Sequence, residues 1–184
     1  TSYRTGPTLW EPMERLRKVL QNARDHGVKE IRVLDRTFNA TPRHAMDRLH
    51  LFADEFSDLW FHLEIHPAFL PQHFRNALKE MPEGLLHLEV GIQTTHPEAL
   101  VAAGRAGKPE VNWEGLSFLC GLENVEVHAD LIGGLPRLTL EHQLKDLRDM
   151  TLLQPTEIQL EILKVLPGTP VAQQAAGYGL RHAP

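Results

Sequence analysis

Imidazole and carboxylate side chains alternate with apolar ones at His62, Glu64 and His66. Side chains two residues apart lie on the same face of a β-strand, so this spacing would present all three groups together. Two imidazoles and a carboxylate can hold a zinc or iron ion when another strand supplies a further ligand, a role open to His128 or Asp130. The same groups can instead hydrogen-bond one another and water in a polar interior, so the pattern alone leaves both interpretations open.

The same alternation returns along the chain, and each segment that shows it has one apolar row and one polar row. A helical pattern follows every such segment, an order typical of βα units with parallel strands. Parallel strands that are covered by helices on both faces have almost wholly apolar sequences. A barrel accommodates the polar rows, because they line its interior while the apolar rows meet an outer ring of helices. The expected strands are residues 30–34, 60–66, 86–93, 125–132 and 157–165.

Length and composition limit the class of protein. The 184 residues suffice for one domain over positions 1–184 but are short for a closed eight-stranded barrel, which typically needs about 250. The net charge of −5 argues against general nucleic-acid binding. No apolar run of about 18 residues occurs, so no membrane span is expected. The single Cys120 excludes an internal disulfide and fits a reducing cytoplasm.

A helical pattern precedes the first expected strand, which is unusual in a fold made of βα units. We therefore expect that an earlier strand is missing and that the chain is a fragment truncated at both ends. Residues 30–34 would then form an unpaired edge strand, which favours pairing with a second copy of the chain.

Three features near the expected strand ends are compatible with a bound ligand. Gly91 and the pair Gly133 and Gly134 allow a ligand to approach the backbone closely, although any tight turn would also favour glycine there. Arg105 can pair with a carboxylate or phosphate, although most arginines in loops are simply solvated. Phosphate-loop, nucleophile-elbow and dinucleotide-binding motifs are absent from the sequence.

Five segments resemble, in their order and spacing, those of radical S-adenosylmethionine (SAM) enzymes. The nearest resemblance is to Fe–S oxidoreductases that carry a cobalamin-binding domain ahead of the radical domain. This resemblance covers nearly the whole chain, and the five segments in register are more specific than any one of them. The segments are residues 35–39, 61–65, 89–94, 128–136 and 163–169.

The resemblance implies a partial (β/α) barrel, open on one side, with about five parallel strands present and the first strand missing. The resemblance also implies that SAM binds at the C-terminal ends of the strands, beside a [4Fe–4S] cluster. An electron from the cluster would cleave SAM and produce a 5′-deoxyadenosyl radical. Motif matching then gives each segment a role. Asp35, Thr37 and Phe38 would meet the methionine amine of SAM, and Arg105 its carboxylate. Glu89 and Gln93 would lie near the ribose and methionine, and Glu64 on the floor of the interior. The adenine would contact Ile132, Gly133, Gly134, Leu163 and Pro167.

The sequence departs from this family in one respect, because the CxxxCxxC loop that holds the cluster is absent and Cys120 stands elsewhere. We expect the cluster cysteines, and any cobalamin-binding segment, upstream of Thr1. The parent enzyme would act on a small molecule, whereas this chain alone would hold no metal and be inactive. Two alternatives remain open at this point. One is a metal-dependent hydrolase built on His62, Glu64 and His66, and the other is a non-catalytic scaffold barrel.

Overall fold

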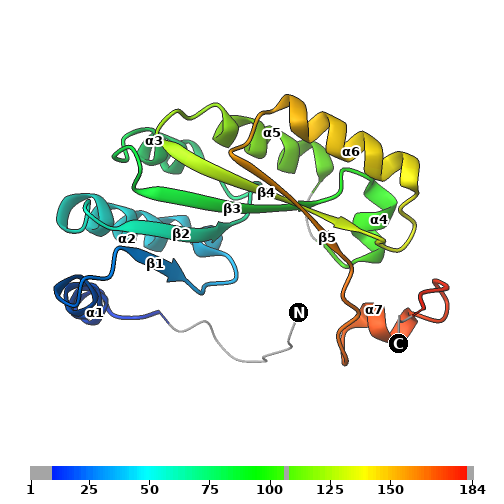
Figure 1. The fold of residues 1–184 in the computed structure, drawn as a ribbon, viewed down its shortest axis with the longest axis horizontal. Helices are drawn as coiled ribbons and strands as arrows, with labels where there is room; N and C mark the ends of the chain where they lie inside the picture. The colour runs from blue at the N-terminus through cyan, green and yellow to red at the C-terminus, as the bar shows by residue number, and fades with distance from the viewer. Residues whose placement is uncertain (1–9, 106–107, 182–184) are drawn as a thin grey trace.

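The computed structural model describes residues 10–105 and 108–181. Five parallel strands form one sheet in the order β1-β2-β3-β4-β5, with helices between them (Figure 1). The expected α/β fold with an open, parallel, five-stranded sheet is therefore confirmed. The elements are α1 (Met13–Asp25), β1 (Glu30–Val33), η1 (Phe38–Ala40), α2 (Pro42–Glu55), β2 (Trp60–Ile65), α3 (Gln72–Lys79), β3 (Leu86–Gln93), α4 (Pro97–Ala102), α5 (Pro109–Cys120), β4 (Val125–Gly133), α6 (Leu140–Leu152), β5 (Glu157–Ile162) and α7 (Pro170–Gln174).

Helix starts follow local side-chain chemistry. The Thr139 hydroxyl accepts a hydrogen bond from the backbone N–H of His142, and this bond caps the start of α6. Helix α2 instead begins at Pro42, whose fixed φ suits the first helical position, and the Thr41 side chain before it makes no capping bond. These two helix starts mark the ends of the turns that precede α2 and α6.

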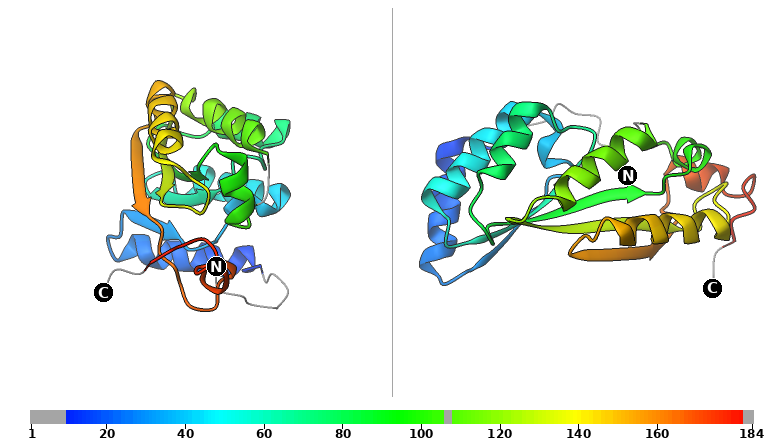
Figure 2. Two further views of the ribbon diagram at one scale, coloured as in Figure 1. Left: turned by 90° about the vertical axis from the view of Figure 1, so that its right-hand side faces the viewer. Right: turned by 90° about the horizontal axis from the view of Figure 1, so that it is seen from above.

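One face of the sheet is apolar and carries the core. The side chains of Leu63, Leu88 and Leu131 are fully buried on it, beneath helix residues such as Phe52 and Leu119. Burying one such side chain contributes about 1.5–3 kcal/mol to folding. Helices α2, α3, α5 and α6 gather on this side of the twisted sheet (Figure 2). The apolar rows therefore meet a layer of helices, as the alternation predicts.

The last strand departs from the expectation in two ways. It ends at Ile162 rather than at residue 165, because β4 ends at Gly133 and the chain then turns at Gly134, which has a φ of +79°. Its apolar row is also poorly covered, with Leu160 44% and Ile162 72% exposed. The reason is that β5 lies at the sheet edge, whereas α6 packs over β4 and α7 lies beyond the end of β5 (Figure 1).

The polar rows share the opposite face of the sheet. The strand register sets Glu64, Glu89, His128 and Glu157 side by side in one row across four strands. Asp130 lies two residues beyond His128 and therefore points to the same side. The sequence-based prediction that the polar rows face a common concavity is thus confirmed. Within residues 10–105 and 108–181, no helix has both the length and the apolar character needed to cross a membrane.

Candidate functional site

Two cavities meet at the C-terminal ends of the strands, and both are lined by His66, Gln93 and Arg105. The larger, of about 460 Å³, has an apolar wall that includes Ile132 and Leu163. The smaller, of about 140 Å³, is polar, and its remaining lining residues are Arg36, Thr37, Glu64, Ile65, Glu89, Gly91 and Asp130. We call the two together the C-terminal cleft. Its position is where parallel α/β folds collect their binding groups.

Arg105 enters the C-terminal cleft from the loop after α4. Its Nη2 donates a hydrogen bond of 2.7 Å to the carbonyl oxygen of Gly91, whereas its Nε is buried and has no hydrogen-bond partner among residues 10–105 and 108–181. A β-bulge lies between Gly91 and Gln93, and Gln93 has the left-handed φ of +70°. A Cβ at Gly91 would lie 2.5 Å from Gln93 Nε2 and 3.0 Å from Arg105 Nη2. Glycine at position 91 is therefore what lets both side chains occupy the cleft.

Three carboxyl groups line the polar half of the C-terminal cleft. Burial, followed by the negative charges of Glu89 and Glu64, raises the pKa of Asp130 to about 7. Partial burial and the negative charge of Glu89 also raise the pKa of Glu64, although solvent still reaches this side chain at the end of β2. Such crowding of like charges disfavours their ionisation and would be relieved by a positively charged ligand group. The polar half of the cleft is therefore suited to a cation, while the Arg105 guanidinium beside it is suited to an anion.

Two buried polar residues that the sequence analysis did not single out hold the rim of the cleft. The Asn39 amide donates to the carbonyl oxygens of His66 and Phe69, both at 2.9 Å, and its Oδ1 accepts from the His66 N–H at 2.8 Å. Asp146, which is 1% exposed on α6, accepts from the hydroxyls of Thr94 and Thr95 and from the Thr95 N–H. The sequence sign for Asn39 was its place in residues 35–39, one of the five segments that carry the family resemblance.

The structure brings most, but not all, of the predicted SAM contacts to the cleft. Seven line it, whereas exposed Asp35, Gly134 and Pro167 line neither cavity. Phe38 is 1% exposed and packs against Phe52 in the core, and Gly133 is buried under β5. Whether these residues contact SAM stays a prediction. The seven that line the cleft are Thr37, Glu64, Glu89, Gln93, Arg105, Ile132 and Leu163.

The histidines do not assemble as the hydrolase alternative requires. Among the residues that the structure describes, His62, Glu64 and His66 form no compact ligand group, because His62 bonds His87 and Glu89 on the neighbouring strand. His66 instead stacks on Phe69 with 4.4 Å between ring centroids. Burial and the neighbouring Arg105 lower the pKa of His66.

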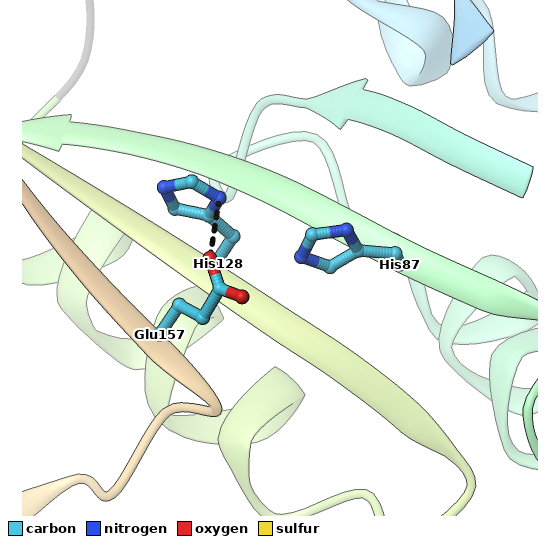
Figure 3. Close-up of side chains that lie close together, drawn as sticks. All are labelled: His87, His128 and Glu157. Atoms are coloured by element: carbon cyan, nitrogen blue, oxygen red, sulfur yellow. Dashed lines mark ion pairs between the residues drawn. The ribbon is translucent and has the colours of Figure 1, made fainter.

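Residues on adjacent strands do come together. In the part of the chain that the structure describes, the group whose ligand atoms lie within 4.8 Å of one another is His87, His128 and Glu157 (Figure 3). His87 and His128 stack with 5.7 Å between ring centroids. Burial and the neighbouring His62 lower the pKa of His87. The cross-strand register therefore decides which imidazoles meet.

The [4Fe–4S] cluster that the resemblance implies does not fit the residues present. Cys120 is the single cysteine of the sequence, and it lies at the end of α5 on the helix side of the sheet. Burial raises the pKa of its thiol to about 11, so it is a poor thiolate donor. A cluster of this kind needs several cysteine ligands. SAM itself fits the site better, because the cleft offers carboxylates for its cationic groups and Arg105 for its carboxylate.

The fold and the cleft together define a class, namely a partial α/β barrel with a cleft at the C-terminal strand ends. No family model and no curated protein matches the sequence. Solved structures do match. The radical SAM methyltransferase TsrM from Kitasatospora setae, with cobalamin and a [4Fe–4S] cluster bound, superposes with a TM-score of 0.72 at 21% identity over 91% of this chain and 34% of that chain.

Two further solved structures agree. TsrM with tryptophan substrate and a SAM analogue bound gives a TM-score of 0.70 at 19% identity, covering 93% of this chain and 33% of that one. Coproporphyrinogen III oxidase (HemN) from Escherichia coli, a radical SAM enzyme, gives 0.62 at 17% identity over 88% of this chain and 39% of that one. The resemblance to radical SAM enzymes is therefore confirmed for the fold. The chain spans about a third of the length of the TsrM chains.

Proposed function

We propose that this chain is the SAM-binding part of a radical SAM enzyme and that another polypeptide segment supplies the cluster cysteines. One observation supports the proposal. The C-terminal cleft of this partial barrel has a cationic, an anionic and an apolar region, and SAM has groups that complement all three. Arg105, with its buried and unpartnered Nε, would bind the methionine carboxylate. Glu64 and Glu89 would face the ammonium and sulfonium charges, and the wall at Ile132 and Leu163 would accept the adenine.

In a radical SAM enzyme the cluster supplies the electron that cleaves SAM. Residues 1–184 contain no CxxxCxxC loop, so we propose that this chain binds and orients SAM but does not cleave it by itself. The solved TsrM structure contains cobalamin, and a cobalamin-binding segment of the parent protein is part of the proposal. The substrate would be a small molecule, and a cytoplasmic location also belongs to the proposal.

Binding and reconstitution experiments test this function. Isothermal titration calorimetry of the chain with SAM should show one saturable site, and anaerobic incubation with iron and sulfide should produce no stoichiometric cluster absorbance. Absence of SAM binding would refute the proposed function. A stoichiometric cluster on the chain would refute the proposal that its cysteines come from elsewhere.

The sheet edge supports one further proposal, pairing between two copies of the chain. Within the described part of the chain β1 lies at the sheet edge and pairs with β2 alone, and Leu34 directly after it is 91% exposed. An uncovered edge strand is a template for another strand. Sedimentation equilibrium over a range of concentrations should detect a reversible dimer, whereas a monomer throughout that range would rule the pairing out.

A further inference from the structure

A line of imidazoles crosses the polar face of the sheet beside the C-terminal cleft. His62, His87 and His128 stand on three adjacent strands, and carboxylates lie at both ends of the line. His62 and His87 are each 8% exposed, and the side chain of His128 is 14% exposed. Buried imidazoles need partners for both ring nitrogens, and the hydrogen bonds along the line supply most of them.

The bonds define which nitrogen of His87 carries the proton. His62 Nε2 lies 2.7 Å from Glu89 Oε2, and an ionised carboxylate only accepts, so this Nε2 is protonated. With both rings neutral, His62 Nδ1 is then an acceptor, and His87 Nδ1, at 3.2 Å, is its donor. His87 Nε2 is therefore left with a free electron pair. Figure 3 shows a ring nitrogen of His87 directed toward His128 and Glu157.

His128 has a carboxylate beside each ring nitrogen. Nδ1 lies 3.4 Å from Glu157 Oε2, and Nε2 lies 3.2 Å from Asp130 Oδ1. The contact between Nε2 and Asp130 Oδ1 lacks hydrogen-bond alignment, and neither buried atom has another partner in the part of the chain that the structure describes. When Nε2 carries the proton toward Asp130, Nδ1 and the Glu157 carboxylate face each other as two electron-pair donors. That arrangement calls for a cation between them.

We propose that His87 Nε2, His128 Nδ1 and the Glu157 carboxylate form a binding site for a divalent transition-metal ion, with Zn²⁺ as the best match. Two imidazoles and one carboxylate suit zinc, whereas Mg²⁺ and Ca²⁺ take oxygen ligands. Behind each imidazole stands a partner of the kind that orients metal-binding histidines. His62, itself bonded to Glu89, stands behind His87, and Asp130 stands behind His128.

The three ligand atoms must draw slightly closer to bind an ion. One ligand atom from each of the three residues now lies within 4.8 Å of those of the other two, and zinc–nitrogen bonds measure about 2.0–2.1 Å. Glu157 can make this adjustment, because its side chain is 61% exposed on the edge strand β5. Three protein ligands leave the fourth position of a tetrahedral ion open to water or to an added ligand. That position would lie on the polar face of the sheet.

A competition titration tests the site. The full chain, purified without an affinity tag, is titrated with Zn²⁺ against a chromophoric chelator, and with Co²⁺, whose visible bands are intense when it has four ligands. We expect one equivalent of each ion to bind. His128→Gln and Glu157→Gln should each weaken zinc binding by about 10-fold or more, because each removes a ligand. His62→Gln should weaken it by about 10- to 100-fold through His87.

Matched controls separate this site from adventitious binding. His50→Gln and His73→Gln change exposed histidines on α2 and α3 and should leave zinc affinity unchanged. Far-UV circular dichroism of every variant shows whether it is folded, and only folded variants are compared. Absence of a saturable site, or equal zinc affinity in wild type, His128→Gln and Glu157→Gln, would overturn the proposal. Co²⁺ spectra typical of six ligands would indicate adventitious binding only and would overturn it as well.

Discussion

Arg105 holds the bulge at the end of β3 through one hydrogen bond, from its Nη2 to the carbonyl oxygen of Gly91 at 2.7 Å. This contact ties the loop after α4 to the point where the strand side chains stop alternating. Burial lowers the pKa of the guanidinium, and the buried Nε has no partner. Arg105 is therefore a positioned hydrogen-bond donor and not a solvated surface charge. Its substitution should consequently affect SAM binding.

Replacing Arg105 tests the carboxylate contact. Arg105→Gln should weaken SAM binding by about 10- to 100-fold, because a hydrogen bond to a charged group contributes about 1.5–3 kcal/mol. The affinity for 5′-methylthioadenosine, which has the adenosine but no amino-acid part, should change little. Calorimetry with both ligands measures the difference. An equal loss of affinity for the two ligands would mean that Arg105 supports the structure of the cleft and does not bind the SAM carboxylate.

Two glycine substitutions separate a cleft effect from a packing effect. A Cβ at Gly115 in α5 would lie 2.1 Å from the carbonyl oxygen of Pro67, which is backbone and cannot move aside. Gly115→Ala should therefore lower the free energy of unfolding by about 1–3 kcal/mol, although alanine normally stabilises a helix interior. At Gly91 the close atoms belong to the side-chain ends of Gln93 and Arg105.

Gly91→Ala should accordingly cost less than about 1 kcal/mol of stability but weaken SAM binding severalfold, because the displaced groups are the ones that face the ligand. Urea denaturation and calorimetry on both variants provide the comparison. If Gly91→Ala unfolds as readily as Gly115→Ala while binding SAM normally, the cleft role of Gly91 is wrong.

Glu64 tests recognition of the sulfonium charge. S-adenosylhomocysteine lacks that charge, so Glu64→Gln should reduce the preference for SAM over S-adenosylhomocysteine severalfold while leaving the affinity for the latter nearly constant. Glu64 is exposed at the end of β2, so the substitution should not disturb packing. Glu14→Gln on α1, far along the chain and also exposed, is the matched charge control. If Glu64→Gln keeps the wild-type preference for SAM over S-adenosylhomocysteine, Glu64 does not interact with the sulfonium charge.

His66 should make stability depend on pH. Burial and Arg105 lower its pKa in the folded state, so below its ordinary pKa of about 6.5 the unfolded chain binds more protons than the folded one. Stability is therefore complete above that pH and falls as the pH decreases. His66→Gln should make the dependence shallower by at most about 1.4 kcal/mol per pH unit. Urea titrations between pH 5 and 7.5 measure both slopes, and parallel slopes would contradict the assignment.

The alternation of side chains made much of this structure predictable. A period of two needs only the local chain, so the sequence sufficed to place Glu64, Glu89 and Asp130 on one face of parallel strands. The apolar row of β5 shows the limit of that reasoning. Its pattern predicted a helix above Leu160 and Ile162, but coverage depends on where α6 and α7 pack, and α6 packs over β4.

The amino-acid sequence by itself determined the strand faces, the helix starts and the absence of cluster cysteines, because each depends on residue type and local spacing. Only the tertiary structure decided which polar side chains touch. His62 on β2 lies two residues from Glu64 in the chain, yet its ring nitrogens bond His87 and Glu89 on the neighbouring strand β3. Strand register sets those pairs. In a parallel sheet the paired strands are joined by long crossovers, so the alternation within one strand fixes its faces but not which residue of the next strand lies opposite.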